Sequence, residues 1–159
     1  MLKDNSYTCF QGVKIKKSEK IFSLLGKLDE LNTVLGIAKA FSQKKTLKQQ
    51  LFLLQQEILR AGSLITLNKD LKEFRKKAIL LGKKTEKIKD SNLKEFVKPG
   101  KTRSGAFLHF ARVVCRQVER EVVALGERKY LPLIEFLNRL SSFLFWLGVK
   151  EEKYPLTTS

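Results

Sequence analysis

Apolar residues recur every three or four positions along most of this chain, and this spacing predicts amphipathic helices. Ser18 is expected to cap the first helix, and Gly126 is expected to end the fourth. Residues 1–18 are polar, have no period and are expected to be irregular. We therefore expect one all-α domain over 1–159, a bundle of five helices with short connections. The five predicted helices cover about 19–41, 46–67, 70–90, 104–126 and 130–149.

The fifth predicted helix, 130–149, is apolar nearly all round, so we expect it at the centre of the bundle or in a subunit interface. Asn138 and Arg139 interrupt it. A buried amide without a partner costs roughly 1–3 kcal/mol, so Asn138 must bond to something. A hydrogen bond to another helix and a contact with a ligand are equally good explanations at this point.

The fourth predicted helix carries Arg112, Arg116, Glu119 and Arg120 on one side. Guanidinium groups match the geometry of phosphate and carboxylate. The Pro99-Gly100 turn lies just before this helix, and loop amides next to a helix start favour anions. An anion site and a solvated or internally paired surface both remain open. The opposite side is an expected core stripe of Phe107, Phe110, Ala111, Val114, Val118, Val122 and Leu125.

Two further features add candidates. Asp29 and Asn32 share a face of the first predicted helix, where a carboxylate can orient an arginine of the fourth helix in this subunit or in a neighbour. Alone, this pattern is ordinary helix sequence. Phe96 precedes the Pro-Gly turn and either fills a cavity or, more commonly, anchors the loop.

Composition narrows the class of protein. The formal net charge is +16, from 32 Lys and Arg against 16 Asp and Glu. The lysines are scattered and no RNA-binding signature accompanies them, so we interpret them as solvated helix surface and keep nucleic-acid binding only as a minor hypothesis. The longest apolar run, 143–149, is too short to cross a bilayer, and the start, MLKDNSYTCF, lacks the apolar core expected of a signal peptide. The sequence thus predicts a cytoplasmic protein without membrane contact.

The sequence offers little for metal or nucleophilic chemistry. Cys9 and Cys115 have no metal-binding spacing, and His109 is the only histidine, so no metal site is expected. Cys115 lies within a helical pattern and is expected to be a small buried residue. No Ser-His-Asp arrangement, P-loop, dinucleotide fingerprint or EF-hand pattern is present. Residue patterns alone lead to a helical bundle with an anion-binding helix.

Five segments, in this order, resemble the PduO-type ATP:cob(I)alamin adenosyltransferases, and the resemblance covers about residues 8–149. Each motif is weak alone, but the set is specific. The segments are LDELNTVLGIA (28–38), LQQEILRAGSLI (54–65), FVKPG (96–100), HFARVVCRQVEREVVAL (109–125) and IEFLNRLSSFLFWL (134–147).

The resemblance implies a trimer of five-helix bundles with active sites between subunits. Such enzymes transfer the adenosyl group of ATP, bound with Mg²⁺, to the cobalt of reduced cobalamin and release triphosphate. By position, Arg112 and Asp29 would form an intersubunit salt bridge important for catalysis. The resemblance also implies that Arg116 and Asn138 contact ATP with Glu119 close by.

The resemblance further implies that Phe96 would line the cobalamin side. The family begins with a T-x-TGD-x-G-x-T segment around the phosphates, whereas here YTCFQG (7–12) aligns with its tail. Lys101 replaces the second glycine of PGG and is a candidate for supplying phosphate charge in place of that loop. Gln117 and Ser142 also depart from the family pattern. These departures leave a second hypothesis, a non-catalytic relative that binds a corrinoid, a nucleotide or a protein partner.

Overall fold

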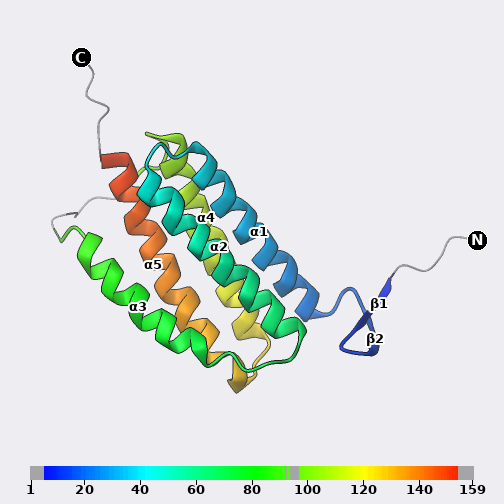
Figure 1. Ribbon diagram of the computed structural model, residues 1–159. Helices are drawn as coiled ribbons and strands as arrows, with labels where there is room; N and C mark the ends of the chain where they lie inside the picture. The colour runs from blue at the N-terminus through cyan, green and yellow to red at the C-terminus, as the bar shows by residue number, and fades with distance from the viewer. Residues whose placement is uncertain (1–5, 92, 94–96, 154–159) are drawn as a thin grey trace, which may run out of the picture.

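The computed structural model describes residues 6–91, 93 and 97–153, and within them five long helices form a bundle (Figure 1). The prediction of an all-α five-helix bundle is therefore confirmed. No helix in this described part is both long and apolar enough to span a membrane. The helices are α1 (Lys20–Phe41), α2 (Lys45–Thr66), α3 (Glu73–Ile88), α4 (Arg103–Ala124) and α5 (Leu131–Lys153), with a short 3₁₀ turn, η1 (Arg128–Tyr130), before α5.

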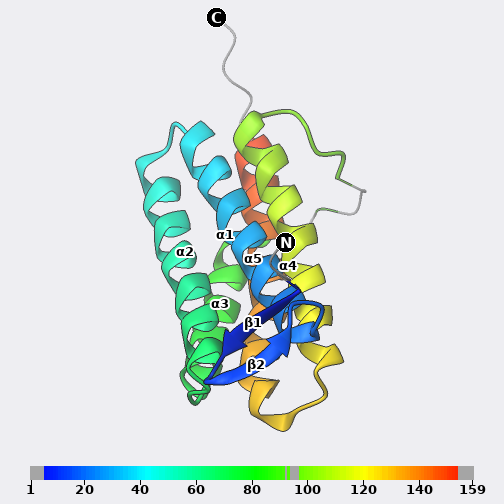
Figure 2. The ribbon, with the colours of Figure 1, turned by 90° about the vertical axis from the view of Figure 1, so that its right-hand side faces the viewer.

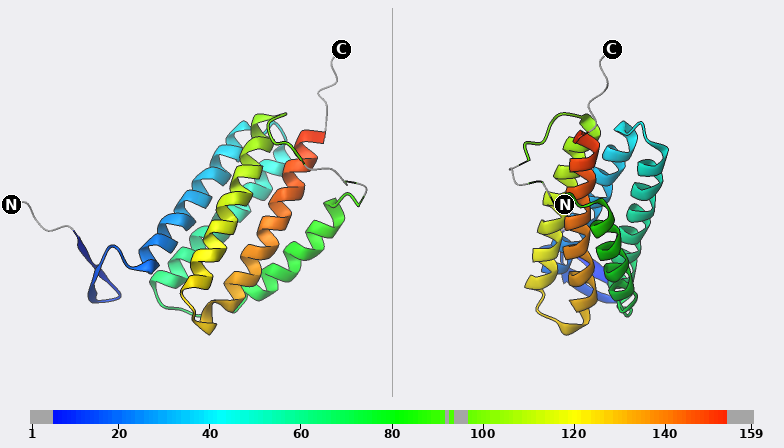
Figure 3. Two further views of the ribbon diagram at one scale, coloured as in Figure 1. Left: turned by 180° about the vertical axis from the view of Figure 1, so that it is seen from behind. Right: turned by 90° about the vertical axis from the view of Figure 1, so that its left-hand side faces the viewer.

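Four helices stand in a row in the order α1, α4, α5 and α3, as the view from behind shows (Figure 3). Helix α2 packs on α1 and lies on the opposite face of this row, the face turned to the viewer in Figure 1. Short connections between α1 and α2 and between α4 and α5 make these pairs antiparallel. Helix α4 therefore has close neighbours on two sides, α1 and α5.

The register between α1 and α4 is set by two side-chain contacts. Near one end, the Ser104 hydroxyl donates to the carbonyl oxygen of Ala38 at 3.1 Å. About three turns further along, Lys27 Nζ donates to Gln117 Oε1 at 3.1 Å. The residue numbers of each pair sum to nearly the same value, as expected for antiparallel helices. Residues near 112 on α4 consequently lie level with residues near 32 on α1.

Helix α5 is the most buried element of the bundle. Leu133, Leu137, Leu140 and Leu144 are fully buried, and Phe136 is 1% exposed. Each such side chain contributes about 1.5–3 kcal/mol through the hydrophobic effect. The prediction that this apolar helix lies at the centre of the bundle is thus confirmed within a single chain. Between its first residue and its last turns, α5 exposes one narrow strip. This strip consists of Glu135, Asn138, Arg139 and Ser142.

The N-terminal segment differs from the prediction. Residues 7–16, expected to be irregular, form an antiparallel hairpin of β1 (Tyr7–Phe10) and β2 (Val13–Lys16) beside one end of the bundle (Figure 2). Its two-residue turn has φ of 51° at Gln11 and 79° at Gly12, the left-handed conformation that tight hairpins require. The Gln11 side chain then donates to the last carbonyl groups of α2, at 3.1 Å each.

Three local expectations can be compared with the structure. Ser18 does not cap α1, because the N-cap position is Glu19 and no side chain bonds there. Gly126 follows the end of α4 with φ of 72° and donates its N–H to Val123 O, so the expected glycine stop is confirmed. Phe110 was wrongly assigned to the core stripe of α4, since it is 47% exposed.

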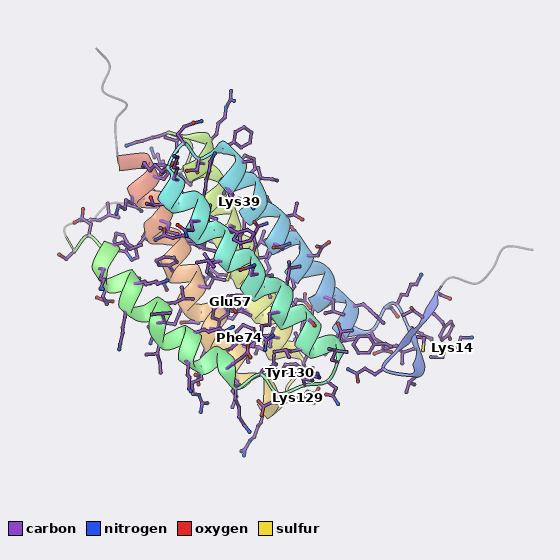
Figure 4. The ribbon with its side chains drawn as sticks, viewed as in Figure 1. Lys14, Lys39, Glu57, Phe74, Lys129 and Tyr130 are labelled. Atoms are coloured by element: carbon purple, nitrogen blue, oxygen red, sulfur yellow. The ribbon has the colours of Figure 1, made fainter. Side chains whose placement is uncertain are left out.

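Helices α2 and α3 are joined mainly by charged side chains. Arg60 of α2 donates to both carboxylate oxygens of Glu73 on α3, at 2.5 and 2.9 Å. Lys77 bonds to Glu73 at 3.0 Å and also to Glu57 of α2. Lys77 lies over the ring of the buried Phe74, so this network lies directly on the core; Glu57 and Phe74 are labelled in Figure 4. The Arg60 hydrogen bond above all, and Lys77 after it, lower the pKa of Glu73 from 4.5 to about 2 against the opposing effect of burial.

The lowered pKa of Glu73 predicts a stability contribution with a defined pH range. A carboxyl group whose pKa falls on folding stabilises the native state above its unfolded pKa, and this contribution is lost as the pH drops from about 4.5 towards 2. The side chain is 33% exposed, so we expect Glu73→Gln to cost only about 0.5–1 kcal/mol at pH 7. Urea denaturation of both proteins at pH 7 and pH 3 measures this.

Glu86→Gln is the matched control, because Glu86 lies on the same helix and forms no ion pair among the described residues. This variant should unfold like the wild type at both pH values. An equal loss in the two variants, or a loss in Glu73→Gln that persists undiminished at pH 3, contradicts the assignment.

Candidate functional site

The charged face of α4 keeps its side chains outside the core while the helix buries its other side. Thr102 caps the helix by accepting the N–H of Gly105 at 3.0 Å. Arg116 and Arg120 are exposed, and Arg112 and Glu119 are partly buried. The buried positions on the other side are Ser104, Gly105, Leu108, His109, Ala111, Val114, Cys115, Val118 and Val122.

Asn138 and Glu119 connect α5 to α4 at this face. The Asn138 amide donates to Glu119 Oε1 at 3.2 Å. Of the two explanations that the sequence left open for Asn138, the hydrogen bond between helices is present. Asn138 is nevertheless exposed, and its second polar atom, the amide oxygen, has no hydrogen bond among the described residues. The amide therefore retains capacity for a ligand while its orientation is fixed by Glu119.

A pocket of about 670 Å³ opens beside this pair, between α3 and α5. Part of its wall is apolar and part carries charges of both signs. The residues contributed by α3 were not singled out from the sequence, and Gly82 gives no signal of the pocket, because a Cβ there would meet the Arg139 side chain at 3.9 Å, an ordinary van der Waals distance. The lining residues are Ala78, Ile79, Gly82, Lys83, Glu86, Glu119, Ile134, Glu135, Asn138 and Arg139.

Arg112 and Asp29 do not meet within one chain. The Arg112 guanidinium lies over the ring of Phe145 on α5, 5.5 Å from the ring centre, and its buried Nε has no hydrogen-bond partner. Asp29 is exposed on α1 and forms no ion pair with any described residue. The level of Arg112 along the bundle matches that of Asn32, whose side-chain oxygen is also buried without a partner. In the described structure, therefore, neither Asp29 nor Arg112 forms an ion pair within its own chain that would compete with the predicted salt bridge between them.

Arg116 and Lys101 lie far apart on one chain. Arg116 is exposed and makes no ion pair with the described residues, so its charge is available to a ligand. Lys101 is exposed and precedes the first turn of α4, fifteen positions earlier. At 1.5 Å per residue, the two positions are separated by about 22 Å along the helix axis. One protomer therefore does not bring Lys101 to the group formed by Arg116, Glu119 and Asn138.

The remaining candidates are placed as follows. Phe96 lies outside the described residues. Cys115 is buried, its Sγ donates to Leu137 O at 3.3 Å, and burial raises the pKa of its thiol far above the usual range. This confirms its structural role and gives it no thiolate for nucleophilic chemistry. Within the described residues, no group of three His, Cys, Asp or Glu side chains is arranged to hold a metal ion.

The chemistry available at this face follows from these placements. It has a free guanidinium at Arg116, a fixed carboxylate and amide at Glu119 and Asn138, and an adjoining pocket with an apolar wall. Arginine binds phosphate oxygens, and an apolar wall accommodates a planar base. The arrangement can thus bind and orient a phosphorylated ligand, while the described part of the chain offers no activated nucleophile of its own there.

Solved structures with this fold include variants of the PduO-type ATP:corrinoid adenosyltransferase of Lactobacillus reuteri. One variant, complexed with cobalamin and ATP, matches with a TM-score of 0.82 and 24% identity, over 94% of this chain and 90% of that chain. Another variant, complexed with ATP, matches with a TM-score of 0.79 and 22% identity, over 96% and 94% of the two chains. At this identity, the likeness establishes the shared fold.

Sequence comparison is more specific. The corrinoid adenosyltransferase of Citrobacter freundii is 33% identical over 165 residues, which cover 96% of this chain and 93% of the relative. That of Bacillus subtilis is 29% identical over 153 residues, covering 89% and 79%. The profile of the cobalamin adenosyltransferase family matches residues 3–151, nearly the whole chain. This protein therefore belongs to the cobalamin adenosyltransferase family.

Proposed function

We propose that this protein transfers the 5′-deoxyadenosyl group of ATP to the cobalt of reduced cobalamin and releases triphosphate. Its family membership and its relatives named corrinoid adenosyltransferases support this activity. The structural observation that carries the proposal is the unpaired Arg116 next to the hydrogen-bonded Glu119 and Asn138 at the edge of a pocket.

The proposed reaction needs little covalent chemistry from the protein. The reduced cobalt is the nucleophile: its electron pair forms the bond to C5′ of ATP, the C5′–O bond breaks, and triphosphate leaves with that bonding pair. A catalytic triad is not required, because the substrate supplies the nucleophile. The task of the protein is to orient the two substrates and to stabilise the negative charge that develops on the leaving group.

Arg116 is suited to the leaving triphosphate because its exposed guanidinium, which pairs with no carboxylate of the described residues, can donate several hydrogen bonds to phosphate oxygens. Asn138, held by Glu119, would orient the nucleotide. We further propose that ATP binds as its Mg²⁺ complex. Mg²⁺ is usually held by one or two carboxylates together with substrate phosphates, and Glu119 is the carboxylate that this group offers.

We propose that the complete site needs more than one copy of the chain. Among the described residues of one chain, neither Arg112 nor Asp29 has an ionic partner, which is consistent with a salt bridge between subunits of a homotrimer. Lys101, remote from Arg116 in its own chain, could contact phosphate only from a neighbouring copy. Phe96 is assigned to the cobalamin side, and the substrates ATP and cobalamin suggest a cytoplasmic location.

The first prediction concerns the activity itself. Purified protein, mixed with ATP and chemically reduced cobalamin without oxygen, should show the spectral change from the reduced corrinoid to adenosylcobalamin and release triphosphate. An active family member serves as the positive control. Absence of product, with the control active, would contradict adenosyl transfer and favour a relative that binds without turnover.

The second prediction concerns Arg116. Arg116→Ala should lower kcat/KM for ATP by about 100-fold, which corresponds to ~2.7 kcal/mol of lost transition-state stabilisation. Steady-state kinetics at saturating reduced cobalamin measure it. Arg128→Ala is the matched control, since it removes an exposed arginine of η1, beyond the end of α4 and outside the lining of the pocket, and should change kcat/KM less than twofold. Equal effects of the two variants would indicate general electrostatics instead of a specific contact.

The third prediction concerns the proposed salt bridge between Asp29 and Arg112. In a double-mutant cycle of Asp29→Asn and Arg112→Gln, the free energies of subunit association should be coupled by about 1–3 kcal/mol, because each charge loses the same partner. Sedimentation equilibrium of the four proteins gives the association constants. Additive effects within about 0.5 kcal/mol would show that the two residues do not pair.

A further inference from the structure

The last turn of α5 carries a buried carboxylate that the proposed reaction does not use. The side chain of Glu152 is 4% exposed. Its Oε1 accepts the N–H of Gly100 at 2.7 Å, which ties the segment before α4 to the end of α5. A Cβ at Gly105, in the first turn of α4, would come within 2.4 Å of Glu152 Cγ. The carboxylate therefore lies directly against the start of α4, and only a glycine at 105 leaves room for it.

The second oxygen of Glu152 faces a histidine. Glu152 Oε2 and His109 Nε2 are 3.6 Å apart, and each is buried without a hydrogen-bond partner. The His109 ring lies so close to α5 that a Cβ at Gly148 would meet three of its atoms at 2.8–3.0 Å. Two glycines, one on each helix, thus make space for this pair between α4 and α5.

From His109, side-chain contacts continue towards the charged face of α4. His109 meets the Phe145 ring edge-on, with ring centres 5.9 Å apart. The other neighbour of Phe145 is the Arg112 guanidinium, 5.5 Å from the ring centre. A continuous row of contacts therefore runs from the backbone of Gly100 through Glu152, His109 and Phe145 to Arg112. These side chains alternate between α4 and α5, so each contact holds the two helices together.

The Glu152 carboxyl group faces a backbone N–H on one side and His109 on the other. Burial lowers the pKa of His109 below its usual value; Glu152 opposes this effect and Arg112 adds to it. The imidazole is therefore neutral at neutral pH and gives Glu152 no full countercharge. The Gly100 N–H and the positive end of α4 supply the favourable interactions that remain. A buried carboxylate in this setting makes the position of the 97–102 segment depend on one side chain.

We propose that Glu152 is a positioning residue for adenosyl transfer: it fixes the 97–102 segment on the first turn of α4 and, through His109 and Phe145, joins that segment to Arg112. The inference rests on the proposed function, in which Phe96 contacts the corrinoid and Arg112 takes part in the subunit contact. Loss of the Glu152 carboxylate should then affect corrinoid binding more than ATP binding.

The test compares Glu152→Ala, Glu152→Gln and Glu151→Ala. Glutamine keeps an oxygen for the Gly100 N–H, and Glu151 is a neighbouring glutamate that pairs with Lys44 instead. Hydrogen–deuterium exchange by mass spectrometry should show at least tenfold faster exchange over 97–102 in Glu152→Ala only, with the 7–16 hairpin unchanged. Kinetics should show a KM for reduced cobalamin raised at least tenfold and a Kd for ATP within twofold of the wild type.

A second variant tests the connection to Arg112. His109→Leu removes the imidazole that lies between Glu152 and Phe145 but leaves the Gly100 hydrogen bond intact. It should lower kcat about fivefold, with the KM for cobalamin and the exchange over 97–102 within twofold of the wild type. Glu152→Ala removes this connection as well as the Gly100 hydrogen bond, so it should lower kcat and raise the KM for cobalamin, whereas His109→Leu should change kcat alone; a general loss of folding would not produce this difference.

Two kinds of failure can be told apart. Wild-type exchange over 97–102 in Glu152→Ala, or a glutamine variant as impaired as the alanine variant, would overturn the inference about Glu152. The same holds if His109→Leu and Glu152→Ala raise the KM for cobalamin equally. An inactive wild type with the exchange difference intact would instead overturn the proposed function and leave the anchoring of the segment established.

Discussion

The structure depends on the burial of α4 between α1 and α5. Val114 and Val118 on α4 and Leu137 and Leu144 on α5 are fully buried, and this packing leaves α4 free to present charge only along its margins. Arg112, on the α5 side, lies over Phe145, whereas Arg116, one turn further, is exposed. The positions of the charged groups are thus consequences of helix packing, and any change in the α4–α5 contact displaces all of them together.

Much of the fold could be predicted because helical periodicity is a local signal. The ends of α1, α2 and α4 lie within two residues of the predicted ends, and Gly126 stops α4 as expected. The hairpin at 7–16 was missed because its strands have four residues each and are largely exposed, so they carry little alternation of burial. Its stability comes from distant partners, such as the α2 carbonyl groups that Gln11 contacts, and these are not visible in the local pattern.

In the candidate site, too, only the features that depend on local spacing could be predicted. Residues that share one helix, such as Arg116 and Glu119, could be placed together by spacing alone. The pairing of Glu119 with Asn138 requires the relative register of two helices, so the sequence left it open. The link between His109 and Glu152 joins residues more than forty positions apart, and neither lies in a recognisable spacing. The distance of Lys101 from Arg116 shows the converse, because motifs that are neighbours in sequence can lie about four helical turns apart.

Unsatisfied polar atoms give the strongest argument that one protomer is an incomplete unit. Arg112 Nε and Asn32 Oδ1 are both buried without partners in the described structure, and an unmade hydrogen bond at such a group costs about 1–3 kcal/mol. The apolar side chains of Phe110 and Val113, one turn apart on α4, are exposed, and this exposure costs further free energy in water. A second chain that covers this part of α4 and brings a carboxylate such as Asp29 would give Arg112 a partner and bury these apolar side chains at once. In our proposal, the same contact that stabilises the oligomer therefore also completes the site for ATP and cobalamin, so assembly and activity are expected to depend on a common set of side chains.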